Sequence, residues 1–233
     1  MIPIRHDNPA RRLPIMTIGI FAINIAAFLY GKMLGISGFD VFTNSWAAIP
    51  FELTQGVDAI SPTSIPVYAT LITSLFVHEG FLHIAANMLY LLVFGNNIED
   101  VLGHFNYLVF YLFCGVVATL VHIATVPGSL IPLVGASGAI AGVLGAFLVA
   151  FPSTRVHVYV PIFFFFTVPA AVVLGLWFLV QLVSVWMDSG GLGGGVAWFA
   201  HIGGFVFGFL LMRVKSRRFR RIEPSRSRPG RCR

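Results

Sequence analysis

The sequence is poor in charged residues. Only 10% of its 233 residues are Asp, Glu, Lys or Arg, against roughly 25% in an ordinary soluble domain. Hydrophobic residues make up 57% of the chain, and the mean hydropathy is +0.87. This composition excludes an ordinary soluble domain, so we expect an integral membrane protein.

Cysteine is also scarce, and charges are missing from the middle of every long apolar run. Cys114 lies in an apolar run and Cys232 near the basic end of the sequence, so neither a disulfide framework nor a metal-ligand cluster is indicated. Transporters and channels usually carry buried charges or paired broken helices. The sequence shows neither feature and no internal repeat, which argues against both classes, and it indicates no cofactor.

The apolar residues are arranged in six runs that are long enough for helices. Proline, glycine and polar residues separate the runs, of which the second and fourth are short and the fifth is unusually long. The pattern predicts an all-α, six-transmembrane-helix bundle with spans at 14–34, 81–98, 104–126, 137–151, 157–187 and 197–212.

The distribution of Lys and Arg predicts the orientation of this bundle. Ten of the 15 basic residues lie in the tail 213–233, and four more lie before the first span or between the fourth and fifth. Only Lys32 falls in a connection on the other side. By the positive-inside rule, we expect a cytoplasmic segment 1–13, a six-helix domain 14–212, and a basic cytoplasmic tail 213–233.

The same features predict where the protein resides and what the tail contacts. The basic N-terminal segment precedes an apolar run without a small-residue cleavage site, so we interpret this run as an anchor. No organelle transit peptide is evident, so we expect the cytoplasmic membrane of a bacterial cell. The tail is expected to attract anionic lipid, and nucleic acid is not expected as a partner.

Two loops on the outer side have unusual compositions. The connection 35–80 is long and rich in apolar residues and proline, so we expect it to rest in the outer leaflet. The loop 188–198 contains five glycines, which is typical of a mobile cap. With the fifth helix as a lateral gate, such a cap could control access to a cavity between the helices.

Four intramembrane polar residues are predicted to lie at one depth. At 1.5 Å per residue, Ser137 and His201 lie roughly 22 and 18 Å above the cytoplasmic boundary, and His83 and Asn87 about 24 and 18 Å above it. The fourth run is too short to cross a hydrocarbon core of about 30 Å. Its helix must therefore begin inside the membrane, with Ser137 at its N-terminus beside a wet cavity.

These four residues have the chemistry of acyl transfer. His201 shares a helix face with Gly204 and Gly208, and a matching small-residue strip follows Ser137, so the two helices can approach closely. Ser137 would be the nucleophile and His201 the general base. His83 and Asn87, spaced i and i+4, could donate hydrogen bonds to an oxyanion.

Each feature taken alone has a structural interpretation. A serine among glycines is more often a packing residue, by roughly four to one, and an intramembrane Asn often joins helices. The remaining His residues near or within the spans, His78, His104 and His122, are interpreted as structural, and Gln181 has no assigned role. The functional hypothesis therefore depends on the coincidence of four residues at one depth.

Three separated motifs resemble those of rhomboid intramembrane serine proteases. The stretch TSLFVHEGFLHIAANM, Thr73 to Met88, is similar to the second-helix signature with its H-x-x-x-N spacing. The stretch GASG from Gly135 is similar to the G-x-S-G nucleophile motif, and AHIGGFVFG from Ala200 to the A-H-x-x-G-x-x-x-G motif.

The resemblance implies a serine endopeptidase that cleaves single-span transmembrane proteins with a Ser137/His201 dyad and without metal or cofactor. It also implies an oxyanion site made by His83, Asn87 and the backbone N–H of Ser137, with the N–H of Ala136 as a further candidate. Where some members have a Tyr stacked on the catalytic His, this sequence has Ala141. The alternative function is a non-catalytic rhomboid-like protein that binds and escorts membrane helices.

Overall fold

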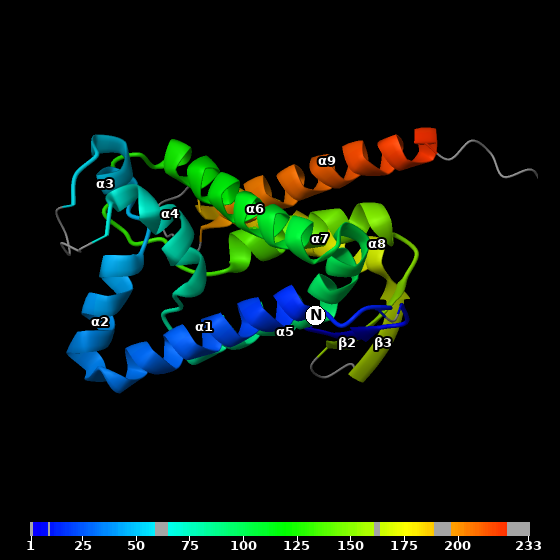
Figure 1. Ribbon diagram of the computed structural model, residues 1–233, viewed down its shortest axis with the longest axis horizontal. Helices are drawn as coiled ribbons and strands as arrows, with labels where there is room; N and C mark the ends of the chain where they lie inside the picture. The colour runs from blue at the N-terminus through cyan, green and yellow to red at the C-terminus, as the bar shows by residue number, and fades with distance from the viewer. Residues whose placement is uncertain (1, 9, 59–64, 161–163, 189–196, 223–233) are drawn as a thin grey trace, which may run out of the picture.

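The protein is a predominantly helical bundle with one small sheet at one end (Figure 1). The structure is a computed structural model that describes residues 2–8, 10–58, 65–160, 164–188 and 197–222. The longer helices are α1 (Ile15–Met33), α2 (Gly35–Trp46), α5 (Phe81–Leu102), α6 (His104–Thr125), α7 (Ser137–Ala150), α8 (Ala170–Asp188) and α9 (Trp198–Ile222).

Five of the helices in the described part of the chain are long and apolar enough to cross a membrane: α1, α5, α6, α8 and α9. They correspond to five of the six predicted spans. The fourth predicted span is α7, which has only 14 residues and is therefore about 21 Å long. The protein is thus a polytopic membrane protein whose shortest core helix does not span the bilayer.

Helix α7 lies at the centre of the bundle, between α5, α6 and α9. Its residues from Gly138 to Phe147 are all buried, as expected of a helix that is apolar on every side. The N-terminal end of α7 is consequently surrounded by other helices, and Ser137 itself is partly buried. The residues at this end are held at a fixed depth by the helices around them.

Glycines bring the backbones of α7 and α9 into direct contact. A Cβ atom added at Gly208 would overlap the carbonyl oxygen of Gly142, and one added at Gly145 would overlap that of Phe205. A Cβ at Gly204 would overlap the carbonyl of Gly138 in the same way. The small-residue strips predicted on these two helices therefore do face each other.

The outer connection 35–80 is more ordered than the expected loop. It contains α2, α3 (Pro50–Gln55), α4 (Thr70–Thr73) and the 3₁₀ turns Val67–Ala69 and Ser74–Phe76. Residue Ala48 forms a two-way backbone bridge with Leu133, which ties this connection to the segment before α7. Most of the glycine-rich loop 188–198, the predicted cap, lies outside the described residues.

The fifth predicted span, 157–187, is wrong in its first part. A helix occupies Ala170–Asp188, but the residues before it form two strands, β2 (Arg155–Val160) and β3 (Phe164–Pro169). Both are rich in β-branched and aromatic residues, which fit a pleated surface better than a helix. Hydropathy alone cannot distinguish such a hairpin from the start of a long helix.

The sheet joins this hairpin to the N-terminal segment. The antiparallel strand order is β1–β2–β3, with β1 at Ile2–His6. On β2, Val156 and Val158 point into the main core, while His6 of β1 bonds through Nε2 to the Val93 carbonyl of α5 at 2.8 Å. The sheet therefore connects the N-terminal segment to α5 and to the hairpin that leads into α8.

A buried carboxylate fixes the start of α1. Glu99 of α5 is 1% exposed and accepts hydrogen bonds from the backbone N–H groups of Met16 and Thr17, at 2.9 and 2.8 Å, and from the Thr17 hydroxyl at 2.7 Å. The first N–H groups of a helix lack partners within the helix. Glu99 supplies these partners and places the N-terminus of α1 against α5.

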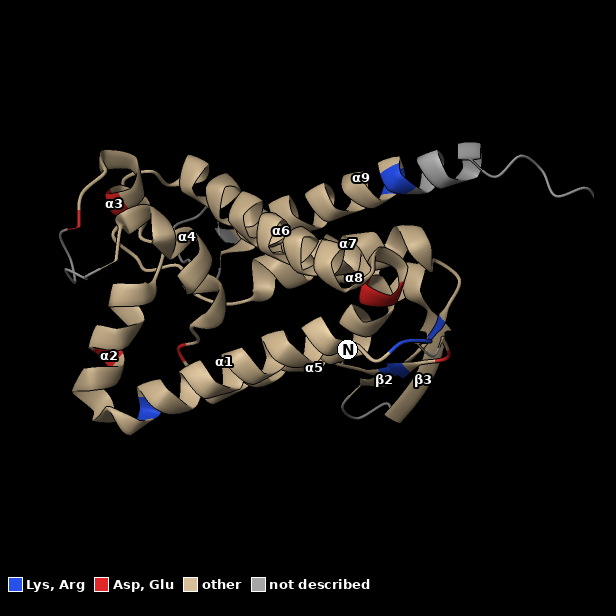
Figure 2. Ribbon diagram, in the orientation of Figure 1, with Lys and Arg blue, Asp and Glu red and all other residues tan. Residues whose placement is uncertain are grey.

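The basic side chains are asymmetrically distributed along the bundle. Figure 2 shows them at the sheet and on α9, whereas Lys32 lies alone at the opposite end of α1. Strand β1 and the C-terminal end of α9 lie toward the same end of the molecule (Figure 1). This arrangement is compatible with two cytoplasmic termini, and the orientation itself stays a prediction.

The contact between α7 and α9 can be tested with alanine. Gly208→Ala forces the two backbones apart, so we expect it to destabilise the protein by roughly 1–3 kcal/mol. Gly175→Ala on α8 is the matched control, because no atom beyond its own stretch of helix lies within 4 Å of the added methyl group. Thermal unfolding in detergent should show a lower midpoint for the first variant only. Equal midpoints would show that the backbones are not in contact.

Candidate active site

Ser137 is the first residue of α7 and is placed there by a sharp turn. The turn depends on Gly135, whose φ of +118° is rarely adopted by other residues. The Gly135 N–H donates to the Ser74 carbonyl oxygen at 2.9 Å. A Cβ at Gly135 would lie 2.8 Å from His83 Nε2, so glycine is needed there both for its conformation and for space.

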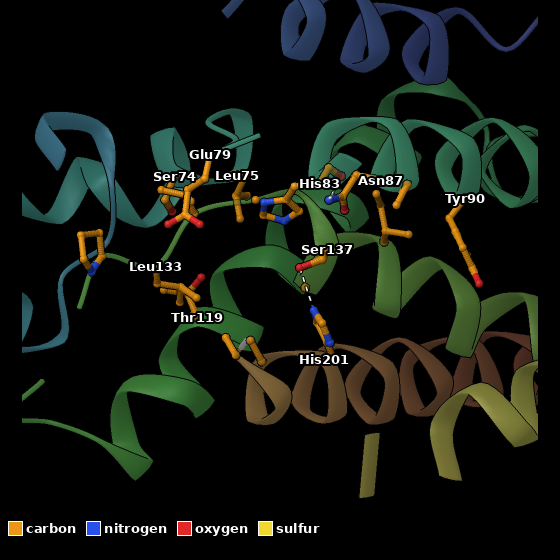
Figure 3. A pocket seen from close by; sticks show the side chains of 18 of the residues that line it. Ser74, Leu75, Glu79, His83, Asn87, Tyr90, Thr119, Leu133, Ser137 and His201 are labelled. Carbon is orange, nitrogen blue, oxygen red and sulfur yellow. Dashed lines mark hydrogen bonds between the residues drawn. The ribbon is translucent and has the colours of Figure 1, made fainter. Parts of the chain in front are cut away.

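The side chain of Ser137 is hydrogen-bonded to His201. The Ser137 Oγ lies 2.8 Å from His201 Nε2 (Figure 3). His201 is in the first turn of α9, three residues before Gly204, where α9 contacts α7. A hydroxyl and an imidazole in this arrangement have the geometry of a nucleophile and its general base.

The other nitrogen of His201 contacts Gln181 of α8. The distance between His201 Nδ1 and Gln181 Oε1 is 2.8 Å, and the Gln181 side-chain amide donates to the Trp177 carbonyl at 3.2 Å. The ring of Trp177 lies 5.9 Å from the imidazole and that of Trp198 lies 6.1 Å from it, measured between centroids. The imidazole is therefore held by one polar partner and two indole rings.

His83 and Asn87 face the same cavity as Ser137 (Figure 3). Both come from α5, one turn apart. The side-chain amide of Asn87 donates to the His83 carbonyl at 2.9 Å, which uses one of its two hydrogens and leaves the other available. A Cβ built on Gly135 would lie 2.8 Å from His83 Nε2 and 3.8 Å from Ser137 Oγ, so these two polar atoms flank one small space.

The backbone N–H groups around Ser137 differ in their partners. The N–H of Ala136 donates to His78 Nε2 at 3.4 Å, so its use by an oxyanion would require that bond to break. Among the described residues, the Ser137 N–H has no hydrogen-bond partner, as is usual at the first positions of a helix. The structure therefore favours Ser137 over Ala136 as a backbone donor to the cavity.

His78 was interpreted from the sequence as a structural residue near a loop, and it supports the turn before Ser137. It is 1% exposed and lies in the loop between the turn Ser74–Phe76 and α5. Burial lowers the pKa of His78 to about 3, so its ring is neutral and Nε2 can accept the Ala136 N–H. The rings of His78 and His83 meet edge to face, with centroids 5.0 Å apart.

The cavity in front of Ser137 has a volume of about 580 Å³. Its polar wall contains the residues already described, and its apolar wall comes from the segment before α7 and from α5, α7 and α8, including Leu133, Ile140 and Trp177. Glu79 is the one charged side chain among its described lining residues. A largely apolar space with a few convergent polar groups is the usual form of a substrate site.

The remaining histidines of the helices are not among the described residues that line this cavity. His104 pairs with Glu99 near the start of α6, and His122 lies near the other end of the same helix. Within the described ranges, no group of three or more His, Cys, Asp or Glu residues is arranged to hold a metal ion.

Comparison with known proteins agrees with the motifs. Residues 67–218 match the family model described as the Rhomboid domain. The chain is 34% identical over 155 residues to the mitochondrial presenilin-associated rhomboid-like protein of Bos taurus. That alignment covers 64% of this chain and 38% of the bovine protein. It is 30% identical over 169 residues to the mitochondrial rhomboid protein 1 of Saccharomyces cerevisiae, and the alignment covers 66% of this chain and 45% of the yeast protein.

A plant relative has a shorter match. Rhomboid-like protein 11, chloroplastic, of Arabidopsis thaliana is 35% identical over 79 residues, or 34% of this chain and 28% of that protein. The aligned region is thus less than half the length of each of these relatives. Because the family model covers well over half of the chain, from the 3₁₀ turn Val67–Ala69 through the membrane-spanning part of α9, the chain belongs to the rhomboid family.

Proposed function

We propose that this rhomboid protein is an intramembrane serine endopeptidase. The observation that carries the proposal is the hydrogen bond of 2.8 Å between Ser137 and His201 at the floor of a cavity in the helix bundle. Family membership adds the expectation of a protease fold. The names of the mitochondrial and plant relatives describe them as rhomboid proteins and say nothing of their substrates.

The first chemical step is the attack of Ser137 on a peptide carbonyl. Ser137 Oγ forms a bond to the carbonyl carbon while its proton passes to His201 Nε2. The carbonyl oxygen becomes an oxyanion, which faces His83, the free amide hydrogen of Asn87 and the Ser137 N–H. The start of α7 adds the positive end of a helix dipole at the same place.

The acyl-enzyme then forms and is hydrolysed. Collapse of the tetrahedral intermediate breaks the C–N bond, and His201 gives its proton to the leaving amine. A water molecule, deprotonated in turn by His201, attacks the ester and releases Ser137. Every proton moves through His201 Nε2, so its distance from Ser137 Oγ is the central geometric requirement.

The depth of the site indicates the substrate class. Ser137 begins a buried helix of 14 residues that is too short to span the bilayer, so we expect a scissile bond to reach it from a neighbouring membrane segment. We infer that the substrates are single-span membrane proteins cleaved in or beside their spans. The alternative, a protein that binds and escorts membrane helices, would not need the hydrogen bond between Ser137 and His201.

The dyad is tested by paired substitutions on a model single-span substrate in liposomes. Ser137→Ala and His201→Ala should each abolish detectable cleavage, because removing either member of such a dyad lowers kcat by on the order of 10⁶. Ser153→Ala, in the exposed turn after α7, is the matched control. A fluorophosphonate probe should label the wild type and Ser153→Ala only. Cleavage by folded Ser137→Ala would sink the proposal.

The oxyanion role is tested on Asn87. Asn87→Ala should lower kcat about 10²–10³-fold with little change in KM, because the lost donor acts mainly in the transition state. Asn106→Ala is the control, since the Asn106 side-chain amide at the start of α6 also donates to a carbonyl four residues earlier, that of Leu102 at the end of α5, at 3.0 Å. Comparable losses in both variants would mean that Asn87 only stabilises its helix.

Location and orientation form the last part of the proposal. We infer the cytoplasmic membrane of a cell, with both ends of the chain in the cytoplasm and the basic tail near anionic lipid. Fluorescent-protein fusions at either end should give fluorescence at the cell periphery, and the fused tags should be protected from protease added outside intact cells. Digestion of both tags in intact cells would reverse the orientation, and labelling of an internal organelle would overturn the location.

A further inference from the structure

The imidazole of His201 has a second polar partner, on a helix that carries no other part of the dyad. Gln181 of α8 lies with Oε1 2.8 Å from His201 Nδ1, on the side of the ring opposite Ser137. Gln181 is 5% exposed, so water has little access to it. The three side chains form one chain of hydrogen bonds across α7, α9 and α8.

The orientation of the Gln181 amide is set by α8 itself. Its Nε2 donates to the carbonyl oxygen of Trp177, one turn earlier, at 3.2 Å. An amide nitrogen can only donate and an amide oxygen can only accept. With the nitrogen directed at Trp177, the oxygen faces His201 and must receive a hydrogen from it.

This contact determines which nitrogen of His201 carries the proton. A neutral imidazole has one donor and one acceptor nitrogen. Since Gln181 Oε1 accepts from Nδ1–H, the lone pair is on Nε2, where it faces the Ser137 hydroxyl. This is the tautomer that a general base for Ser137 requires, and the opposite tautomer would turn a donor toward the serine.

We propose that Gln181 is the positioning residue of the Ser137–His201 dyad, so that Ser137, His201 and Gln181 form one hydrogen-bonded triad. The inference rests on the proposed function and deepens it. When Ser137 attacks, its proton moves to Nε2 and the Nδ1 proton stays in place, directed at the side-chain oxygen Oε1 of Gln181. The amide dipole stabilises the imidazolium and takes up no proton.

A purely structural role for Gln181 makes a different prediction. A hydrogen bond between membrane helices contributes little to stability on average, and the Gln181 side chain also fills space beside Trp177. If space filling were its whole role, methionine, which has nearly the same shape and no amide oxygen, would replace it without loss. If accepting the Nδ1 hydrogen is its role, glutamate, which keeps that acceptor, would retain activity.

The experiment compares the wild type with Gln181→Met and Gln181→Glu in the full chain, on the liposome substrate. Gln181→Met should lower kcat about 10- to 100-fold with KM within about twofold, because the base loses its orientation while the cavity keeps its shape. Labelling by the fluorophosphonate probe should slow in parallel. Unfolding midpoints should match the wild type, which separates this effect from misfolding.

The pH–rate profile of Gln181→Glu distinguishes the two roles, because it should stay unchanged if Gln181 has only a structural role. This variant should cleave at an appreciable rate, with the acidic limb of its pH–rate profile at higher pH than in the wild type, since a carboxylate favours the protonated imidazole. Among the described residues, His83 of α5 and His122 of α6 also act on the charge of His201, and Glu79 lines the same cavity. All three are unchanged in the variants.

The outcomes separate the two proposals. A wild-type chain that neither cleaves nor reacts with the probe overturns the proposed function. A wild type that does both, together with a fully active Gln181→Met or an unmoved profile for Gln181→Glu, overturns the role of Gln181 alone. Loss in the Met variant with retention and a shifted profile in the Glu variant establishes it.

Discussion

The direct contact between the backbones of α7 and α9 is the constraint on which the rest of the site depends. In a bilayer, lipid competes with protein for apolar surface, so helices associate through close packing and polar contacts. Here Gly204 meets Gly138, and Gly208 meets Gly142, one turn further along. This register places Ser137 and His201 on the same side of the contact, where larger residues at the glycine positions would hold them apart.

Helix α7 begins inside the membrane, so the backbone N–H and C=O groups just before it require polar partners. The outer connection 35–80 supplies them. Irregular backbone at membrane depth is tolerated only inside protein or beside water. The Ser74 carbonyl accepts the N–H of Gly135, His78 accepts that of Ala136, and Ala48 pairs with Leu133. The described part of the connection 35–80 therefore supports the nucleophile turn from the outer side.

Short-range patterns predicted the core of the fold and most of the site. Spacing along single helices was enough to place His83, Asn87, Ser137 and His201 at one depth, because helix rise converts sequence distance into height. Gln181 and His78 were seen in the sequence but received no functional role, since their partners lie on other elements and lateral packing leaves no periodic signal. The β2–β3 hairpin was missed because its residues are as apolar as those of a membrane helix.

The position of Gln181 on α8 links access to the site with its chemistry. Helix α8 is the most weakly enclosed of the helices that build the cavity, with Leu179, Val180 and Val183 exposed, and its first residue follows directly from β3, which is fixed in the sheet. A swing of its outer half away from α9 would widen the route to Ser137 and at the same time withdraw the amide from His201. In this open state His201 would lack the hydrogen bond that orients it. Substrate entry and cleavage would therefore occur in sequence, and Ser137 would be fully reactive only after α8 had returned to its closed position.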